Sequence, residues 1–435
     1  MIQRDHYLKK LIAARGNGFP KVITGIRRCG KSYLLSDIYK GYLLGNGVQA
    51  EDILFLDLDR FENAKLRDPL FLGDYIMGWA KGKKMTYVML DEIQRVYTIV
   101  NPNLSKGEHV LAKGGDVETI SFVDVVLSLA RQPNIDLYVT GSNSKMLSSD
   151  IVTEFRDKAT NIHIAPLSFD EFYAYRQGEE SNAIYEYLRY GGMPLAVMKE
   201  KEEKGEYLKS LFATTYFRDI LERNRIVKGG ALEDLCTFLS SSVGQLINPE
   251  KISRTYESVT RQSVDSKTVG RYISFFLDAF LLSEAGRFDL KGRREIGALK
   301  KYYFTDLGLR NARLNFAFSD EGQLLENLVY NELLYHNYSV SVGEFDTIEK
   351  DKQGHSIRKG NEVDFYARRD EREIYVQICS DISSEETRKR EIRPYFLLND
   401  QVQKILVVNR PFERSRDENG FTIIGMADFL LRFIP

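Results

Sequence analysis

The chain has 435 residues, of which 43% are hydrophobic and 28% are charged, and its net charge is −1. This length predicts about two to four domains, and the balanced charge argues against a protein that binds polyanions over its whole surface. No apolar run approaches the roughly 18 residues that span a bilayer, and the N-terminal residues lack the apolar core of an export signal. The three cysteines lie far apart and form no zinc-binding pattern. We therefore expect a cytoplasmic protein without a membrane partner.

The first motif is the stretch GIRRCGKS, from Gly25 to Ser32, which matches the phosphate-loop pattern G-x-x-x-x-G-K-[ST]. Its glycines let the backbone curl so that successive N–H groups point at phosphate oxygens. Lys31 would add a positive charge for the β- and γ-phosphates, and Ser32 would offer a hydroxyl to Mg²⁺. A strand is predicted before the loop, and the helix after it directs its N-terminal dipole at the same anion. This context favours a nucleotide site over a chance match in a turn, with the binding residues Gly25, Arg28, Cys29, Gly30, Lys31, Ser32 and Tyr33.

A second motif, MTYVMLDEIQRV, supplies the acidic residues that such a site needs. Residues 87–90 predict a buried parallel strand, and Asp91 and Glu92 follow it directly. Asp91 would hold Mg²⁺ through water, and Glu92 could orient or deprotonate the attacking water. An ordinary strand that ends at an acidic turn is the alternative, which the phosphate loop makes less favoured.

Two further predicted strands complete an open, mostly parallel sheet, so the fold class of the first half is α/β. One covers residues 52–60, and the other, NIDLYVTGSNS, ends at Ser142 and Asn143. If that last strand neighbours the acidic one, an amide there could hold the attacking water or sense the γ-phosphate. Ligands bind at the carboxyl ends of strands in such sheets, where all these motifs fall. Residues 101–119, rich in Gly, Asn and Lys, predict a projecting loop or short hairpin.

Six motifs occur in order along the chain: GIRRCGKS, LDEIQ, TGSNS, PLSFDEFYAY, YGGMP and YFRDILERN. Together they resemble the large prokaryotic family of AAA-type ATPases that carry a C-terminal domain of unknown function. The resemblance implies ATP and Mg²⁺ as cofactors, Lys31, Ser32, Asp91 and Glu92 as core residues, and Asn143 at the sensor position.

Oligomeric ATPases of this kind often complete one subunit's site with an arginine from the next. Arg156 lies in the corresponding neighbourhood as a catalytic candidate, and Arg218 is a candidate sensor at the start of a helical domain. The alternative for each is a surface arginine that pairs with Asp157 or Asp219. A homo-oligomer is therefore an expectation that the sequence leaves open.

The sequence predicts four domains: a phosphate-loop ATPase core (residues 1–165), a helical lid (166–230), a winged helix-turn-helix domain (231–315) and a C-terminal α/β domain (316–435). Residues 251–301 hold 11 Lys and Arg against 6 Asp and Glu. Three predicted helices and a basic hairpin in this region would contact DNA. The contacts would come from Ser266, Lys267 and Arg271 on the third helix and Lys291, Arg293 and Arg294 on the hairpin. A protein-interaction module, or a merely solvated charged face, is the alternative.

The C-terminal elements follow the order αβββαβ and resemble the restriction-endonuclease-like fold. Active members hold Mg²⁺ with a helix Glu, a strand Asp and an E-x-K motif; Glu326 and Asp364 match the first two, but the third position reads Gln377-Ile378-Cys379. Without that glutamate and lysine, the site lacks charged side chains on which metal-assisted cleavage depends. We therefore expect a catalytically inactive domain, and we expect the adjacent Glu362 to point away from this site.

The function that these motifs favour is ATP hydrolysis with Mg²⁺ that drives conformational change on DNA or on a protein client. Two alternatives stay open at this point: a nucleotide-dependent switch or DNA-binding module that does not hydrolyse ATP, and a DNA-processing nuclease.

Overall fold

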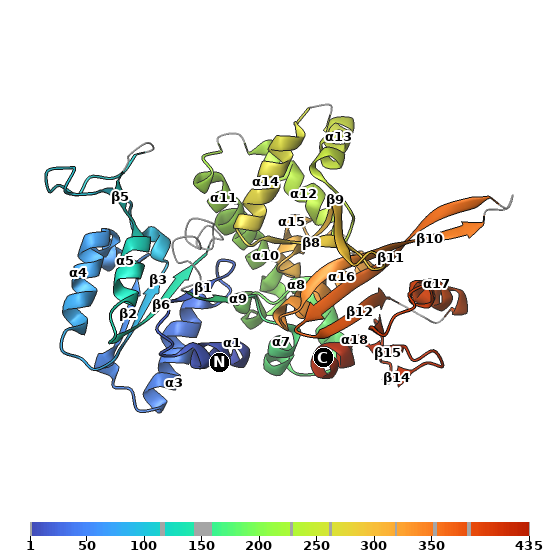
Figure 1. Ribbon diagram of the computed structural model, residues 1–435, viewed down its shortest axis with the longest axis horizontal. Coiled ribbons are helices and arrows are strands. Elements are labelled where there is room, and N and C mark those ends of the chain that lie inside the picture. The colour runs from blue at the N-terminus through green and yellow to red at the C-terminus, as the bar shows by residue number, and fades with distance from the viewer. Residues whose placement is uncertain are drawn as a thin grey trace. The chain divides into compact units, whose positions relative to one another are not determined.

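The computed structural model describes residues 2–113, 118–142, 159–226, 229–260, 263–317, 320–350, 355–380 and 384–434. The chain forms two compact units: Met1–Ala165 with Asp278–Phe280, and Pro166–Leu277 with Leu281–Pro435. Figure 1 colours their elements in chain order. None of the helices in these ranges is long and apolar enough to cross a membrane.

A five-stranded sheet forms the centre of the first unit, in the order β2-β3-β6-β1-β7 with every pair of neighbours parallel. Its strands are β1 (Lys21–Thr24), β2 (Ile53–Asp57), β3 (Thr86–Asp91), β6 (Ile135–Gly141) and β7 (Thr160–His163). Strands β1, β3 and β6 are buried at every residue, as expected of a parallel sheet covered on both faces. The predicted α/β fold with a parallel core is confirmed.

Helices cover both faces of this sheet. They are α1 (Asp5–Ala14), a continuous helix made of α2 (Lys31–Tyr33), the π-type turn η1 (Leu34–Tyr39) and α3 (Lys40–Gly45), then α4 (Pro69–Ala80) and α5 (Phe122–Ala130). The short 3-10 turns are η2 (Ala50–Asp52), η3 (Phe61–Arg67) and η4 (Ile93–Arg95). Strands β4 (Ile99–Val100) and β5 (Thr119–Ile120) pair antiparallel, which agrees with the predicted projecting hairpin.

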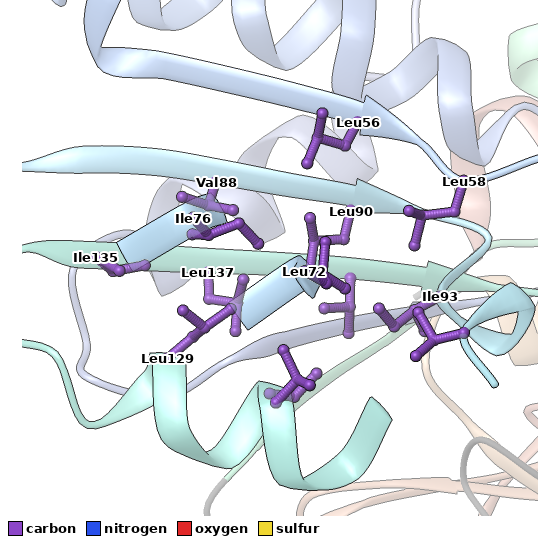
Figure 2. Packing of buried hydrophobic residues seen from close by; sticks show 14 of the residues in the cluster. Leu56, Leu58, Leu72, Ile76, Val88, Leu90, Ile93, Leu129, Ile135 and Leu137 are labelled. Carbon is purple, nitrogen blue, oxygen red and sulfur yellow. The ribbon is translucent and has the colours of Figure 1, made fainter. Parts of the chain in front are cut away.

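One apolar cluster fixes α4 and α5 on the sheet. Leu72 and Ile76 of α4 and Leu129 of α5 pack with Val88 and Leu137 of the buried strands (Figure 2). Each of these side chains is fully buried or nearly so, which stabilises the unit by about 1.5–3 kcal/mol per side chain. The cluster holds β3 and β6 side by side, and their carboxyl ends carry two of the predicted motifs.

The second unit begins with helices. They are α7 (Phe169–Arg176), α8 (Glu180–Tyr190), α9 (Pro194–Met198), α10 (Lys201–Leu211), η6 (Phe212–Phe217), α11 (Arg218–Arg223), α12 (Gly230–Ser241), α13 (Pro249–Thr260), α14 (Ser266–Asp278), α15 (Leu307–Arg313) and α16 (Glu321–Tyr335). Three later ones are α17 (Glu385–Phe396), α18 (Met426–Asp428) and η7 (Phe429–Phe433). The helices that the sequence predicts between residues 166 and 278 are therefore present.

An eight-stranded sheet follows, in the order β14-β15-β13-β12-β11-β10-β8-β9. Its strands are β8 (Leu282–Asp289), β9 (Arg294–Phe304), β10 (Ser339–Lys350), β11 (Ser356–Arg369), β12 (Arg372–Cys379), β13 (Gln403–Val408), β14 (Ser415–Arg416) and β15 (Thr422–Gly425). The hairpin predicted as the wing is formed by β8 and β9, but β8 also pairs parallel with β10. The hairpin and the C-terminal strands therefore share one sheet across the boundary predicted at residue 315.

The β10–β11 hairpin continues past its neighbours in this sheet (Figure 1). Strand β10 pairs with β8 only at residues 342–344, and β11 pairs with β12 only at residues 365–369. Among the described residues, the distal halves of β10 and β11 pair only with each other, at residues 344–350 and 356–362.

Candidate nucleotide site

The predicted phosphate loop connects the carboxyl end of β1 to α2, and its backbone has the curled form that the glycines allow. Gly25 and Gly30 have φ values of 149° and 102°, and Arg28 has a φ of 60°. A Cβ atom at Gly25 would lie 2.2 Å from the carbonyl oxygen of Ile164, so no larger residue fits there. The predicted binding residues differ in exposure: Gly25, Cys29 and Lys31 are buried, Gly30 and Tyr33 half-buried, and Arg28 and Ser32 exposed.

The side chain of Lys31 lies inside the loop. Its Nζ donates hydrogen bonds to the carbonyl oxygens of Gly25 at 3.0 Å and Ile26 at 3.1 Å. Both partners are neutral, so neither contact compensates the charge of this buried ammonium. An anion within the loop would supply that compensation.

The carboxylate of Asp91 lies beside the loop, at the end of β3. Thr140 Oγ1 donates a hydrogen bond to it at 2.5 Å, and the Ser32 side chain lies near enough to stabilise its ionised form. Burial raises the pKa of Asp91, the two hydroxyls oppose that rise, and the neighbouring charges of Glu92 and Asp57 add to it. A divalent cation would favour the ionised carboxylate. The oxygen ligands of Ser32 and Asp91 are of the type Mg²⁺ prefers, so these residues fit the ion.

Glu92 has a left-handed backbone, with φ 54° and ψ 49°, which is strained for a residue with a side chain. Its N–H donates to Thr140 Oγ1 at 3.0 Å. Its carboxylate accepts hydrogen bonds from Gln94 Nε2 and, at 3.4 Å, from Ser142 Oγ. The turn therefore directs the Glu92 side chain towards Ser142, which follows the end of β6.

Thr140 and Gln94 are site residues that the sequence reasoning missed. The single hydroxyl of Thr140 donates to Asp91 and accepts from the N–H of Glu92, so it orders both acids. The sequence contained one signal for Thr140, since it lies two residues before Ser142 and alternate residues of a strand share a face. Asn143 and Arg156, predicted as catalytic, lie outside the described residues.

Residues 17–173 match a family described as an AAA domain, and residues 181–320 match a domain of unknown function, DUF8612. A protein of Haemophilus influenzae, described as uncharacterized, is 30% identical over 438 residues, which cover 99% of each chain. The chain belongs to the same family as this Haemophilus protein. A second relative, the uncharacterized protein MJ1544 of Methanocaldococcus jannaschii, is 24% identical over 95% of this chain and 86% of its own length.

Among solved structures, Aeropyrum pernix Orc1 in complex with DNA is 13% identical, with a TM-score of 0.30 over 72% of this chain and 92% of that one. AMPPCP-bound DnaA from Aquifex aeolicus is 14% identical, with a TM-score of 0.31 over 63% of this chain and 88% of that one. TM-scores this low carry no argument about this chain. The match to the AAA domain and the parallel sheet, by contrast, give the first unit an AAA-type ATPase fold.

The candidate DNA-contact residues of the second unit have different surroundings. Lys267 and Arg271 are exposed on α14, as is Arg294 on β9. Arg293 Nη2, however, donates to both carboxylate oxygens of Glu373 at 2.9 Å, and Lys291 Nζ lies 5.0 Å from the centre of a phenylalanine ring of β10. Two of the hairpin's cations thus contact the C-terminal sheet, and DNA contact through residues 251–301 stays a prediction.

Arg218, the candidate sensor, is exposed on α11, where its Nε lies 2.7 Å from Glu222 Oε1. This pairing is of the surface type that the sequence left open as the alternative, although the partner is Glu222 and not Asp219. Such an exposed pair contributes little to stability, so it leaves Arg218 able to exchange partners.

The predicted metal residues of the C-terminal domain surround a lysine. Lys301 Nζ of β9 donates to Glu326 Oε1 at 2.9 Å and to Glu362 Oε1 at 2.7 Å. Asp364 accepts from the backbone N–H of Ile378 at 2.8 Å. The expectation that Glu362 points away is wrong, because it lies two residues from Asp364 on the same strand and alternate side chains share a face.

An ammonium group between two carboxylates leaves them poorly suited to a metal ion. Among the described residues, no group of three or more His, Cys, Asp or Glu has a metal-binding arrangement. The residues present at the C-terminal cluster therefore do not fit the Mg²⁺ of the nucleases that the sequence resembles. Inactivity of this domain as a nuclease stays a prediction.

Proposed function

We propose that the chain is an ATPase of AAA type, which binds ATP with Mg²⁺ on the phosphate loop and hydrolyses it to drive a conformational change in its second unit. The observation that carries the proposal is the closeness of the Ser32 side chain of the loop to the Asp91 carboxylate of β3, whose ionised form it stabilises. It unites two motifs that are distant in the sequence, and the second motif brings Glu92 with it.

Each residue has a role that follows from its surroundings. Lys31, which donates to two neutral carbonyl groups, compensates the negative charge of the phosphates. Ser32 and Asp91 would hold Mg²⁺, directly or through water, and the ion would supply positive charge against the charge that develops on the phosphates. Thr140 keeps Asp91 and Glu92 in a fixed relation, because both bond to its hydroxyl.

Glu92 is the residue that makes this a hydrolase and not only a binding site. Its carboxylate is held by Gln94 and Ser142 near the end of β6. From there it accepts a hydrogen bond from the attacking water and takes its proton, while the water oxygen bonds to the γ-phosphorus and the bond from that phosphorus to the bridging oxygen breaks, with ADP as the leaving group. The strained backbone at Glu92 is consistent with a functional constraint at this position.

The test is Glu92→Gln, compared with the exposed control Glu62→Gln on the same unit. The amide keeps the size of the side chain but cannot take a proton, so phosphate release at saturating ATP should fall by about 10²–10⁴-fold. ATP binding, measured by calorimetry, should change little in either variant. Hydrolysis by E92Q at the wild-type rate would remove the assigned role, and a wild-type chain that binds ATP without turnover would leave only a nucleotide switch.

A further inference from the structure

Arg4 lies just before α1 and reaches the phosphate loop from outside. The residue is only 4% exposed. Its Nη1 donates to the carbonyl oxygen of Cys29 at 3.0 Å, and its Nη2 donates to that of Ala165 at 2.8 Å. The guanidinium also lies 4.8 Å from the centre of the Tyr7 ring, and the Tyr7 hydroxyl accepts from the N–H of Ala165 at 2.9 Å.

The bond to Cys29 matters because of where that carbonyl lies in the loop. In a trans peptide the C=O of one residue and the N–H of the next point in opposite directions. By bonding to the Cys29 carbonyl, Arg4 fixes the orientation of the Cys29–Gly30 peptide and with it the direction of the Gly30 N–H. A cationic donor also polarises the peptide and makes that N–H a stronger donor.

The bond to Ala165 ties the same guanidinium to the last residue of the first unit. Around it, residues 164–165 pack closely on the back of the loop. Ile164 accepts a hydrogen bond from Cys29 Sγ at 3.4 Å, and its carbonyl lies against Gly25. The phosphate loop and the segment that leads into the second unit are therefore held by one side chain.

We propose that Arg4 is a positioning residue of the nucleotide site: it aims the Gly30 N–H at the phosphates and couples the loop to the segment that leaves the ATPase unit. This inference rests on the proposed ATP binding. Arg4 would not touch the nucleotide, because it acts through the Cys29–Gly30 peptide. Its planar guanidinium can donate to two carbonyl oxygens at once, which the single ammonium group of a lysine would do less well.

The experiment compares Arg4→Gln and Arg4→Lys with Arg15→Gln. Arg15 is a matched control, because it lies at the other end of α1 and donates its Nε to the hydroxyl of Tyr87 at 2.8 Å, away from the loop. Binding of ATP and of inorganic pyrophosphate is measured by calorimetry, the melting temperature by calorimetric scanning, and KM and kcat from phosphate release.

R4Q should bind ATP and pyrophosphate about tenfold more weakly, as expected for loss of a hydrogen bond to a charged group. KM should rise with much less change in kcat, and R4K should recover part of the affinity. R15Q should bind both ligands as the wild type does. If R4Q does not fold, the comparison of R4K with the wild type tests the same inference.

Two failures can be told apart. If the wild type binds neither ATP nor pyrophosphate, the proposed function is wrong and the inference falls with it. If the wild type binds both and R4Q binds them equally well, only the inference is overturned. Equal losses of affinity and melting temperature in R4Q and R15Q would also overturn it, since Arg4 would then act through general stability alone.

Discussion

Two regions of this molecule place a buried lysine beside carboxylates at a sheet, with opposite results. In the first unit, the ammonium of Lys31 bonds to two carbonyl oxygens of its own loop, and the nearby Asp91 is bound by hydroxyls. In the second unit, the ammonium of Lys301 bonds directly to Glu326 and Glu362. The charge of Lys31 can therefore be neutralised by an external anion, whereas the charge of Lys301 is already neutralised by carboxylates of the chain itself.

The pKa shifts follow this difference. Burial alone would lower the pKa of Lys301, but the charges of Glu326, Glu362 and Asp364 outweigh it and raise the pKa. Burial and the charge of Glu326 raise the pKa of Asp364, against the effect of Lys301. Whether a carboxylate in a predicted metal site can bind a metal ion therefore depends on the charged groups that surround it.

An effect on stability is expected from Lys301→Met. The variant removes the buried cation that bonds to Glu326 and Glu362, whose side chains are 17% and 39% exposed, and it should lower the free energy of unfolding by about 1.5–3 kcal/mol at neutral pH. Urea denaturation measures it. The control is Lys300→Met, whose partner Glu284 is equally exposed, and which should lose less than about 1 kcal/mol.

Adding Mn²⁺ to the same variant, K301M, tests whether Lys301 is what prevents the acidic cluster from binding a metal ion. Without the lysine, the carboxylates should bind the ion, so the melting temperature of K301M should rise with Mn²⁺ and that of the double variant K301M/E326Q should rise less. A wild type stabilised by Mn²⁺ through Asp364 and Glu326 would contradict our interpretation of Lys301.

The next effect, on binding, is expected from Lys31→Met. Removing the one buried ammonium that faces the phosphates should weaken ATP binding about a hundredfold or more, measured by calorimetry. The fold should lose little, because the two carbonyl partners are neutral. K301M should show the reverse behaviour, with ATP affinity intact and stability reduced. If K31M and K301M lose affinity and stability equally, the two lysines do not have the different roles described above.

The last effect concerns the pH dependence of stability, through a buried carboxylate that forms no ion pair within the described part of the chain. Glu332 of α16 accepts one hydrogen bond, from the N–H of Phe169 at 2.7 Å. Burial raises its pKa to about 8, and the charges of Asp170 and Glu171 on α7 add to the rise. Between the ordinary value of 4.5 and about 8, the folded state therefore holds a proton that the unfolded state has lost.

Stability should consequently fall as pH rises through this window, by up to about 1.4 kcal/mol per pH unit from this group. Glu332→Gln keeps the acceptor for Phe169 but cannot ionise, so the gap between its unfolding free energy and that of the wild type should widen steadily from pH 5 to pH 8. Parallel profiles for the two proteins would show that Glu332 stays ionised when folded.

The phosphate loop, the acidic pair and the parallel sheet could be predicted because each depends on local spacing. Asp91 follows its strand directly, and parallel strands bring their carboxyl ends to one edge. Arg4 could not be predicted as a partner of this site, since its contacts join segments that no local pattern links. Thr140 left one signal, its alternate position with Ser142 on the same strand, but its bond to Asp91 depends on which strands are neighbours.

The C-terminal cluster was harder to predict for a similar reason. The sequence places Lys301 in the predicted winged-helix domain, and it reaches Glu326 because β8 pairs with β10 and brings β9 into the same sheet. Cys379 stands where the E-x-K motif has its lysine, but Lys301, from a different strand, lies among the acidic residues. Sequence position alone does not show which strands become neighbours.

The extended β10–β11 hairpin affects how the protein must be handled at high concentration. Its free edges carry backbone groups that could pair with another chain, and Ile348 on it is 80% exposed. The ion pairs Arg358–Asp346 and Lys359–Glu349 place charges along this ribbon, which discourages such pairing. Salt screens those charges, so preparations kept at low ionic strength should stay dispersed longer than those stored in concentrated salt.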